Sequence, residues 1–246
     1  MTQARTGGDV ALVTGGSGAL GAALARTLDA RGFRVALHYA GNRDGAEKAA
    51  AALTNPSCVV GADVSDWDST TTMVQQVEAA LGPVAVLVNS GAVRRDGLMA
   101  TQSVTDWTRT IEVNLVGTFH TCRAVLPGML RARWGRIVNV VSPSGLIGSR
   151  GQTAYSASKA GVIGMTRSLA LECGRRNVTV NALSPGFMVT ELTEAVPDAV
   201  RQGYVERTAT RRFVTPEEVA RGLDLLIDAE SMTGQVLSID GGLSIS

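Results

Sequence analysis

Short apolar, β-branched runs alternate with longer helical segments along the whole chain. Several runs, such as VAVLV and RIVNVV, are apolar at nearly every position, as in strands buried on both faces. The expected strands are Asp9–Thr14, Arg34–Tyr39, Ser57–Ala62, Val84–Asn89, Arg136–Ser142, Val178–Ser184 and Gln235–Asp240. The helix-period segments are Leu20–Arg31, Asp44–Leu53, Asp66–Leu81, Val104–Ala132, Tyr155–Arg175 and Pro216–Ala229. This alternation predicts an α/β fold, a doubly wound parallel sheet with helices on both faces.

The length and composition of the chain predict one domain. Its 246 residues are 45% hydrophobic and 18% charged, which provides apolar surface for one sizeable core. No linker, low-complexity tract or internal repeat divides residues 1–246. Residues 187–214, which include Pro197 and Gly203, fit neither the strand nor the helix pattern well. We expect this segment to form a mobile helical lid over a substrate.

The charged and metal-binding side chains argue against several classes of function. The 23 basic and 22 acidic residues leave a net charge of +1, without the basic stripe typical of nucleic-acid-binding proteins. Three scattered cysteines and two histidines predict neither a disulfide framework nor a metal site. No apolar run reaches the length of a membrane span. We therefore expect a cytoplasmic protein that binds no metal, nucleic acid or membrane.

A glycine-rich loop, GGSGALG at residues 15–21, joins the first expected strand to the first expected helix. Such a loop brings backbone N–H groups and a helix N-terminus to a pyrophosphate. A tight turn also collects glycines, so the motif alone is weak. Its place between strand and helix favours a dinucleotide-binding site over an ordinary turn.

The end of the second expected strand bears on which dinucleotide is bound. An NAD site usually places an acid there to hold the ribose 2′-hydroxyl. Here the segment reads HYAGNR, with no acid before Asp44. Arg43 and His38 favour a 2′-phosphate and hence NADPH, whereas an Arg43 that is merely a solvated helix-start charge leaves NADH open. Asp63 follows the third strand and is expected either to accept from the adenine amine or to cap a helix.

Tyr155 and Lys159 lie four residues apart, on one face of an expected helix. A phenol with a pKa near ~10 is a poor acid–base group at neutral pH, and a nearby ammonium lowers that pKa. Ser142, at the end of a strand, could hold a substrate carbonyl, and Asn114 lies within a long helix. Each residue alone is more often an ordinary polar group. Their occurrence together behind the glycine loop favours a nicotinamide-dependent reductase or dehydrogenase.

These motifs resemble those of the classical short-chain dehydrogenase/reductase family, from Val10 to about Leu243. The matching segments are TGGSGALG, ADV, LVNSG, YSASK, NALSPG and TGQVLSIDGG. The resemblance implies a single Rossmann domain, strand order 3-2-1-4-5-6-7, and a homotetramer packed through the two long helices and the C-terminal strand. It implies a catalytic tetrad of Asn114, Ser142, Tyr155 and Lys159.

The resemblance also implies a role for each member of the tetrad. Tyr155 would protonate the developing alkoxide, and Ser142 would hydrogen-bond the same oxygen. Lys159 would lower the tyrosine pKa and hold the nicotinamide ribose, and Asn114 would position a water that relays protons. Together with the residues discussed above, it predicts cofactor contacts at Thr14, Gly15, Ser17, Gly18, Ala19, Leu20, Gly21, Tyr39, Asn42, Arg43, Asp63, Val64, Asn89, Gly91, Tyr155, Lys159, Pro185, Gly186, Met188 and Thr190.

Two departures from the family pattern bear on the cofactor. The family's phosphate loop usually has Gly where Ala19 stands, and often Arg, which helps to bind NADP, where Gly18 stands. The family's Asn-Asn-Ala-Gly appears here as NSGA at residues 89–92, with Asn89 retained and a methyl added at Ala92. NADPH is the expected cofactor, with NADH as the open alternative.

Within the family, the chain looks most like bacterial 3-oxoacyl-(acyl-carrier-protein) reductases. This resemblance implies NADPH-dependent reduction of a 3-oxoacyl thioester on acyl carrier protein, in fatty-acid or polyketide/polyene biosynthesis. Arg133 and Arg176 occupy the positions of the carrier-docking arginines, and Arg131, Arg136 and Arg175 would thicken that patch. A reductase or dehydrogenase of small alcohols, sugars or steroids is the alternative, and a non-catalytic nucleotide-binding scaffold is a more distant one. We expect Pro143–Gln152 and residues 187–214 to determine substrate specificity.

Overall fold

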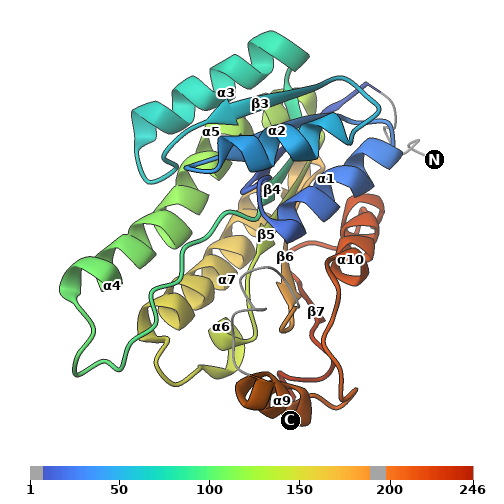
Figure 1. Ribbon diagram of the computed structural model, residues 1–246. Coiled ribbons are helices and arrows are strands. Elements are labelled where there is room, and N and C mark those ends of the chain that lie inside the picture. The colour runs from blue at the N-terminus through green and yellow to red at the C-terminus, as the bar shows by residue number, and fades with distance from the viewer. Residues whose placement is uncertain (1–7, 189–197, 246) are drawn as a thin grey trace.

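The computed structural model describes residues 8–188 and 198–245. Its centre is a seven-stranded sheet, with helices around it (Figure 1). The strands are β1 Val10–Thr14, β2 Arg34–Tyr39, β3 Ser57–Gly61, β4 Val84–Asn89, β5 Gly135–Val140, β6 Val178–Pro185 and β7 Val236–Ile239. Their order is β3-β2-β1-β4-β5-β6-β7, and every neighbouring pair is parallel. The predicted doubly wound sheet is therefore confirmed, including the strand order.

The helices connect successive strands and lie on both faces of the sheet (Figure 1). They are α1 Ala19–Ala30, α2 Arg43–Ala51, α3 Trp67–Leu81, α4 Val104–Ile111, α5 Gly117–Ala132, α6 Ser144–Ile147, α7 Thr153–Cys173, α9 Asp198–Arg207 and α10 Pro216–Asp228. Local sequence explains several helix starts. Asp66 caps α3 through the N–H of Ser69, and Thr215 and Glu218 cap α10 reciprocally.

The predicted helix over Val104–Ala132 is interrupted in the structure. A π-helical turn, η1 (Glu112–Val116), separates α4 from α5. Gly117 follows this turn directly and packs against the loop that precedes α3. A Cβ on Gly117 would lie 2.7 Å from Cγ2 of Val64. Such single-turn π segments are frequent at functional sites. The spacing of the apolar residues predicted one continuous helix, because that spacing does not indicate where a π-helical turn interrupts it.

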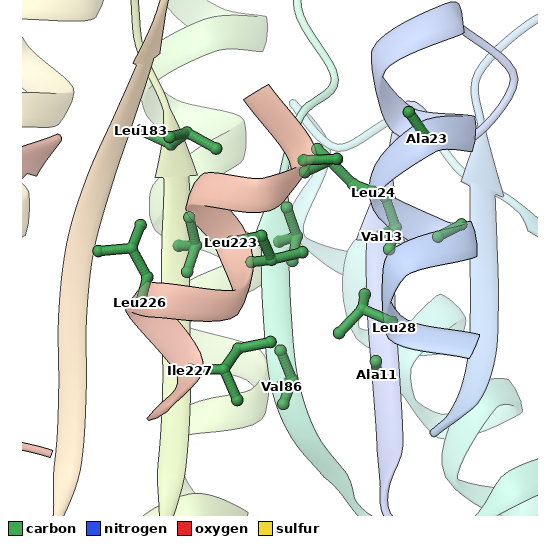
Figure 2. Packing of buried hydrophobic residues seen from close by; sticks show 14 of the residues in the cluster. Ala11, Val13, Ala23, Leu24, Leu28, Val86, Leu183, Leu223, Leu226 and Ile227 are labelled. Carbon is green, nitrogen blue, oxygen red and sulfur yellow. The ribbon is translucent and has the colours of Figure 1, made fainter. Parts of the chain in front are cut away.

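Two apolar clusters fix the helices to the sheet. On one face, α1 and α10 lie side by side over the central strands, and Leu24, Leu28, Leu223 and Leu226 are fully buried there (Figure 2). On the other face, α3, α5 and α7 bury a second cluster that includes Met73. Burial on both faces explains the nearly continuous apolar runs of the strands.

The expected lid lies only partly within the described residues. Met188, near the start of the expected lid, forms an isolated parallel β-bridge with Val214, the last residue of the lid. Helix α9 occupies Asp198–Arg207. Thr190, a predicted cofactor contact, lies outside the described residues. Among the helices of residues 8–188 and 198–245, none combines the length and apolarity needed to cross a membrane.

Candidate active site

Close backbone packing explains the glycines of the loop between β1 and α1. Gly15 has a φ of +66°, and a Cβ there would lie 2.7 Å from Cα of Gly91. A Cβ on Gly21 would lie 2.2 Å from the carbonyl oxygen of Gly15. Gly18 has room for a side chain, because the nearest atom to its Cβ position is 3.6 Å away. The loop therefore depends on glycine at residues 15 and 21, where the backbone segments touch.

The start of α1 suits an anion. Gly18 is its N-cap without a side-chain hydrogen bond, and its first turn carries no acidic residue. Gly18 and Ala19 are exposed to solvent, and Ser17 and Leu20 are half-buried beside them. Free N–H groups at a helix N-terminus bind phosphate, so this loop fits the pyrophosphate of a dinucleotide.

Thr14 and Asn89 use their side chains to hold the strand ends together. The Thr14 hydroxyl accepts hydrogen bonds from the N–H groups of Ser90 and Gly91, each at 3.1 Å. The buried Asn89 amide donates to Oδ1 of Asn139 at 2.9 Å and accepts from the Thr121 hydroxyl at 2.7 Å. These bonds position the backbone of β4 next to the glycine loop, and cofactor contacts by Thr14, Asn89 and Gly91 remain predictions.

His38 supports the glycine loop and does not contribute a charge. Its side chain is 3% exposed, its Nδ1 accepts from the Gly15 N–H at 3.3 Å, and its Nε2 donates to the Ala62 carbonyl at 3.0 Å. Burial lowers its pKa and outweighs the opposing effects of the Ala62 bond and the Asp63 charge. Because the ring is buried and both of its nitrogens have backbone partners, the expectation that His38 favours a 2′-phosphate is wrong.

The predicted ribose contacts lie at the junction of β2 and α2. Asn42 caps α2 by accepting from the Gly45 N–H at 2.9 Å. Arg43 is exposed and donates to Oε1 of Glu47, one turn along the helix, at 2.7 Å. The Tyr39 ring lies over Gly61, where a Cβ would be 2.9 Å from Cζ. Because both ring nitrogens of His38 have backbone partners, Arg43 is the cation at this junction that is predicted to contact a 2′-phosphate.

Asp63 and Val64 have protein partners that the sequence analysis missed. Oδ2 of Asp63 accepts from Nη2 of Arg109 at 2.7 Å, and Oδ1 accepts from the N–H and hydroxyl of Ser65. Burial raises the pKa of Asp63, but the hydrogen bonds from Ser65 and Arg109 together lower it below its usual value. The carbonyl of Val64 contacts Nδ1 of His120 at 2.9 Å. The adenine contact of Asp63 stays a prediction.

Three members of the predicted tetrad gather beside the carboxyl end of β5. Ser142 follows β5, and its hydroxyl accepts from the Ser144 hydroxyl at 2.9 Å and lies close enough to the Tyr155 phenol to lower its pKa. Tyr155 lies in the first turn of α7. Nζ of the buried Lys159 lies 5.6 Å from the centre of the Tyr155 ring and donates to the Val140 carbonyl at 2.8 Å. The four-residue spacing thus brings phenol and ammonium together as expected.

The pKa of Tyr155 differs from the sequence-based expectation. Burial raises it above its ordinary value, the charge of Arg94 and the bond to Ser142 lower it, and the charge of Asp96 raises it. Burial has the largest effect on the phenol, and the expectation of a lowered pKa for Tyr155 is therefore wrong. Nζ of Lys159 is bonded to a backbone carbonyl, and burial weakens its charged form as well.

Asn114, the fourth member, lies in the π-helical turn and is fully buried. Its Oδ1 accepts from the Val93 N–H at 2.8 Å, and its Nδ2 donates to the Val93 carbonyl at 2.9 Å and to the Ser158 hydroxyl at 3.2 Å. The amide therefore connects the loop after β4 to α7, next to Lys159. Its role in a water relay stays a prediction.

The burial of Lys159 makes a testable prediction about stability. Burial lowers its pKa from 10.5 to about 8. In the folded protein the proton is therefore lost first as the pH rises, and between pH 8 and 10.5 the unfolded state binds more protons. We expect the unfolding free energy of the wild type, relative to Lys159→Met, to rise by about 1.4 kcal/mol per pH unit in that window. Urea unfolding at several pH values measures it, and parallel curves for the two proteins would contradict it.

The remaining predicted cofactor contacts surround the end of β6. Pro185 pairs with Ile239 of β7, and the Gly186 N–H donates to the Ile239 carbonyl at 2.9 Å. A Cβ on Gly186 would lie 2.6 Å from Cα of Asp240, so close packing requires this glycine. Met188 is half-buried beside it.

Of the arginines expected to dock a carrier protein, four are exposed and one is buried. Arg133 and Arg176 are exposed just before the amino ends of the adjacent strands β5 and β6, as are Arg131 and Arg175. Arg136 is 1% exposed and cannot belong to this patch. Its guanidinium donates to the carbonyls of Ile227, Gly135 and Asn177 and stacks 4.5 Å from the Trp134 ring centre. The exposed arginines lie at the amino ends of the strands, whereas Ser142 follows the carboxyl end of β5, so the strand separates the two.

The described residues contain no cluster of three or more His, Cys, Asp or Glu side chains that could hold a metal ion. The Tyr155 phenol, the Ser142 hydroxyl and the Lys159 ammonium gather at the carboxyl end of β5, and the loop that fits a dinucleotide pyrophosphate follows β1 in the same sheet.

Comparisons with known proteins agree with this arrangement. The chain matches the family described as short chain dehydrogenase over residues 9–201. Nodulation protein G of Rhizobium sp. strain N33 is 40% identical over 241 residues, which cover 97% of this chain and 98% of the relative. The 3-oxoacyl-(acyl-carrier-protein) reductase FabG of Thermotoga maritima is 40% identical over 248 residues, which cover 98% and 100%. That of Staphylococcus epidermidis strain RP62A is 36% identical over 238 residues, which cover 95% and 98%. The chain therefore belongs to the short chain dehydrogenase family of nicotinamide-dependent oxidoreductases.

Proposed function

We propose that this protein reduces the ketone of a 3-oxoacyl thioester, carried by acyl carrier protein, to the 3-hydroxyacyl thioester with NADPH. The observation that carries the proposal is the cluster of Ser142, Tyr155 and Lys159 at the carboxyl end of β5, while the loop that fits a dinucleotide follows the carboxyl end of β1 in the same parallel sheet. The reductases among its relatives support the choice of substrate, because they are similar over almost their whole length.

Each side chain of the cluster has a proposed role in this reduction. Bound NADPH would supply a hydride, and the protein would supply the proton. Ser142 lies close enough to Tyr155 to lower the pKa of the phenol, so both hydroxyls could reach one substrate oxygen. The phenol, whose pKa burial raises, is protonated at neutral pH and can donate a proton, but a nearby positive charge must stabilise the phenolate that it leaves. Lys159, fixed by the Val140 carbonyl, stabilises the phenolate that forms and would hold the nicotinamide ribose.

NADPH is proposed over NADH because of the residues between β2 and α2. No carboxylate precedes Asp44 there, and Arg43 is exposed at the first residue of α2, where it could meet a 2′-phosphate. Its bond to Glu47 would compete with such a contact. A firm preference for NADH would overturn this part of the proposal.

The carrier protein is proposed to dock on the patch formed by Arg131, Arg133, Arg175 and Arg176. Acidic carrier surfaces are attracted by exposed arginines, mainly through faster association. The six residues of β5 separate this patch from Ser142, a distance of about 20 Å at ~3.3 Å per residue. Docking there requires either a substrate arm of that length or the site of another copy in the proposed homotetramer.

The pathway is proposed as fatty-acid or polyketide/polyene biosynthesis. The nodulation protein G relatives are as similar as the reductases, which favours no single pathway. Substrate choice is proposed to lie in Pro143–Gln152 and in the lid at residues 187–214, which includes α9.

The test is NADPH oxidation with a short 3-oxoacyl thioester on acyl carrier protein, compared with the pantetheine thioester and a free ketone. We expect the carrier thioester to give the highest kcat/KM and NADH to be the poorer cofactor. Equal or better turnover of simple alcohols, sugars or steroids would favour the alternative class of substrate. Dinucleotide binding without turnover of any of these compounds would favour a non-catalytic scaffold.

The docking patch makes a separate prediction. We expect the double substitution Arg133→Glu and Arg176→Glu to raise KM for the carrier thioester about tenfold, because it reverses the charge that attracts the carrier. Turnover of the pantetheine thioester should not change, and the difference should shrink at high salt. Arg221→Glu, at an exposed position on α10, is the matched control. An unchanged KM in the double variant would remove the docking patch from the proposal.

A further inference from the structure

A row of buried polar side chains crosses the layer between the sheet and the helices α5 and α7. Asn89 and Asn139 are direct partners on the neighbouring strands β4 and β5. Thr121 belongs to α5 and Thr166 to α7. All four side chains are at most 4% exposed, next to the apolar cluster that includes Ile137. A buried polar group is costly unless it is hydrogen-bonded, so these side chains need specific partners.

The hydrogen bonds of the two amides join four elements in sequence. Oδ1 of Asn89 accepts from the Thr121 hydroxyl at 2.7 Å, and Nδ2 of Asn89 donates to Oδ1 of Asn139 at 2.9 Å. Nδ2 of Asn139 donates in turn to the Thr166 hydroxyl oxygen at 2.9 Å. The row therefore runs from α5 through β4 and β5 to α7, and Asn139 is the member that ties α7 to β5.

Apolar packing and hydrogen bonds attach α7 to two different strands. Among the strands, α7 contacts mainly β6, and its Val162 and Ile163 form an apolar cluster with Ala182. Apolar contacts are not directional, so they fix the height of a helix along a sheet less sharply than hydrogen bonds do. The directional contacts of α7 are those with β5.

Two hydrogen bonds fasten α7 to consecutive residues of β5. Lys159 and Thr166 lie seven residues apart, about two helical turns, and therefore on the same face of α7. Thr166 accepts from Asn139, and the Lys159 ammonium donates to the carbonyl of the next residue, Val140, at 2.8 Å. Val140 is the last residue of β5, just before the segment that carries Ser142. The height of α7 along β5 therefore sets where the ammonium lies relative to Ser142.

We propose that Asn139 and Thr166 are positioning residues, whose hydrogen bond sets the height of α7 on β5 and so holds Tyr155 and Lys159 beside Ser142. This inference rests on the proposed function, in which these three groups carry out the reduction. Because both positioning side chains are fully buried between β5 and α7, they act through the helix and not by contact with the substrate. Loss of their bond would leave the Asn139 amide buried without one of its partners, and α7 would shift to relieve that cost.

A double-mutant cycle in unfolding free energy tests the inference without any assay of turnover. It combines Thr166→Val, which removes the accepting hydroxyl at nearly constant volume, with Lys159→Met. Residues two helical turns apart that bond different partners have additive effects unless the structure couples them. We expect the effect of Lys159→Met to be smaller in magnitude in the Thr166→Val background, because the ammonium has already lost its place beside the Val140 carbonyl. Urea unfolding of the four proteins at one neutral pH measures this difference.

Val77→Ala is the matched control for the cycle. Val77 is fully buried in the apolar cluster on the same face of the sheet, but it belongs to α3. We expect its substitution to destabilise the protein and to be additive with Lys159→Met. Additive behaviour of Thr166→Val as well would overturn the inference. Thr166→Ala, which leaves room for a water at the Asn139 amide, takes the place of Thr166→Val if that variant does not fold.

Turnover is the second readout. We expect Thr166→Val to lower kcat for the carrier thioester about ten- to hundredfold with KM nearly unchanged, because misplaced catalytic groups slow the chemical step. Thr166→Ser keeps the hydroxyl and should restore most of kcat, whereas Val77→Ala should leave kcat nearly unchanged. A wild type without turnover would contradict the proposed function, while the cycle would still decide whether Thr166 positions Lys159. Coupling in the cycle with an unchanged kcat in an active protein would overturn the positioning role alone.

Discussion

Tyr155→Phe is expected to lower kcat for the reduction by about 10²–10⁴, while NADPH binding stays nearly unchanged. The substitution removes the phenol hydroxyl and keeps the ring that packs near Lys159. The proton donor is lost, but the glycine loop and Arg43 are untouched. Steady-state kinetics and an equilibrium titration with NADPH measure the two effects separately.

Ser142→Ala provides the comparison for this prediction. It removes the second hydroxyl at the same substrate oxygen, and we expect a loss of similar size. Because the phenol remains, the Tyr155 titration should still be visible in this variant. Turnover of Tyr155→Phe within a few-fold of the wild type would contradict the assignment of the phenol as proton donor, provided that thermal unfolding shows an intact fold.

Gly21→Ala is the second substitution with a large expected effect. Its Cβ would lie 2.2 Å from the Gly15 carbonyl oxygen and 2.8 Å from the Gly15 carbonyl carbon, both backbone atoms that cannot rotate away. We expect the glycine loop to shift away from α1, which lowers the unfolding free energy by about 1–3 kcal/mol. The same shift should weaken dinucleotide binding at least about tenfold, because the N–H groups of the loop would no longer point at the pyrophosphate.

Gly18→Ala is the matched control from the same loop. Gly18 has a φ of −87°, which any residue adopts, and the nearest atom to its Cβ position is 3.6 Å away. We expect its unfolding free energy to stay within ~0.5 kcal/mol of the wild type. Chemical denaturation of both variants decides the matter. Equal destabilisation of Gly18→Ala and Gly21→Ala would show that close packing at Gly21 is not the cause.

Much of the fold could be predicted because it depends on local patterns. Apolar runs with turn residues between them require buried parallel strands with helical crossovers, and the resemblance to known proteins supplied the strand order. The spacing of Tyr155 and Lys159 placed both on one helix face, and the glycine loop lies where a nucleotide site needs it. Spacings within one element survive folding because helix and strand geometry is the same in every protein.

The charges around the site could be placed only by the tertiary structure. His38 is neutral because the glycine loop and Ala62 enclose it, and Arg136 is buried because the Ile227 carbonyl, 91 residues away in sequence, accepts from it. The Asp96 carboxylate is likewise held by Gln152, 56 residues away in sequence. The charge and pKa of a side chain depend on which distant groups enclose it and exclude water, and a linear pattern does not contain that information.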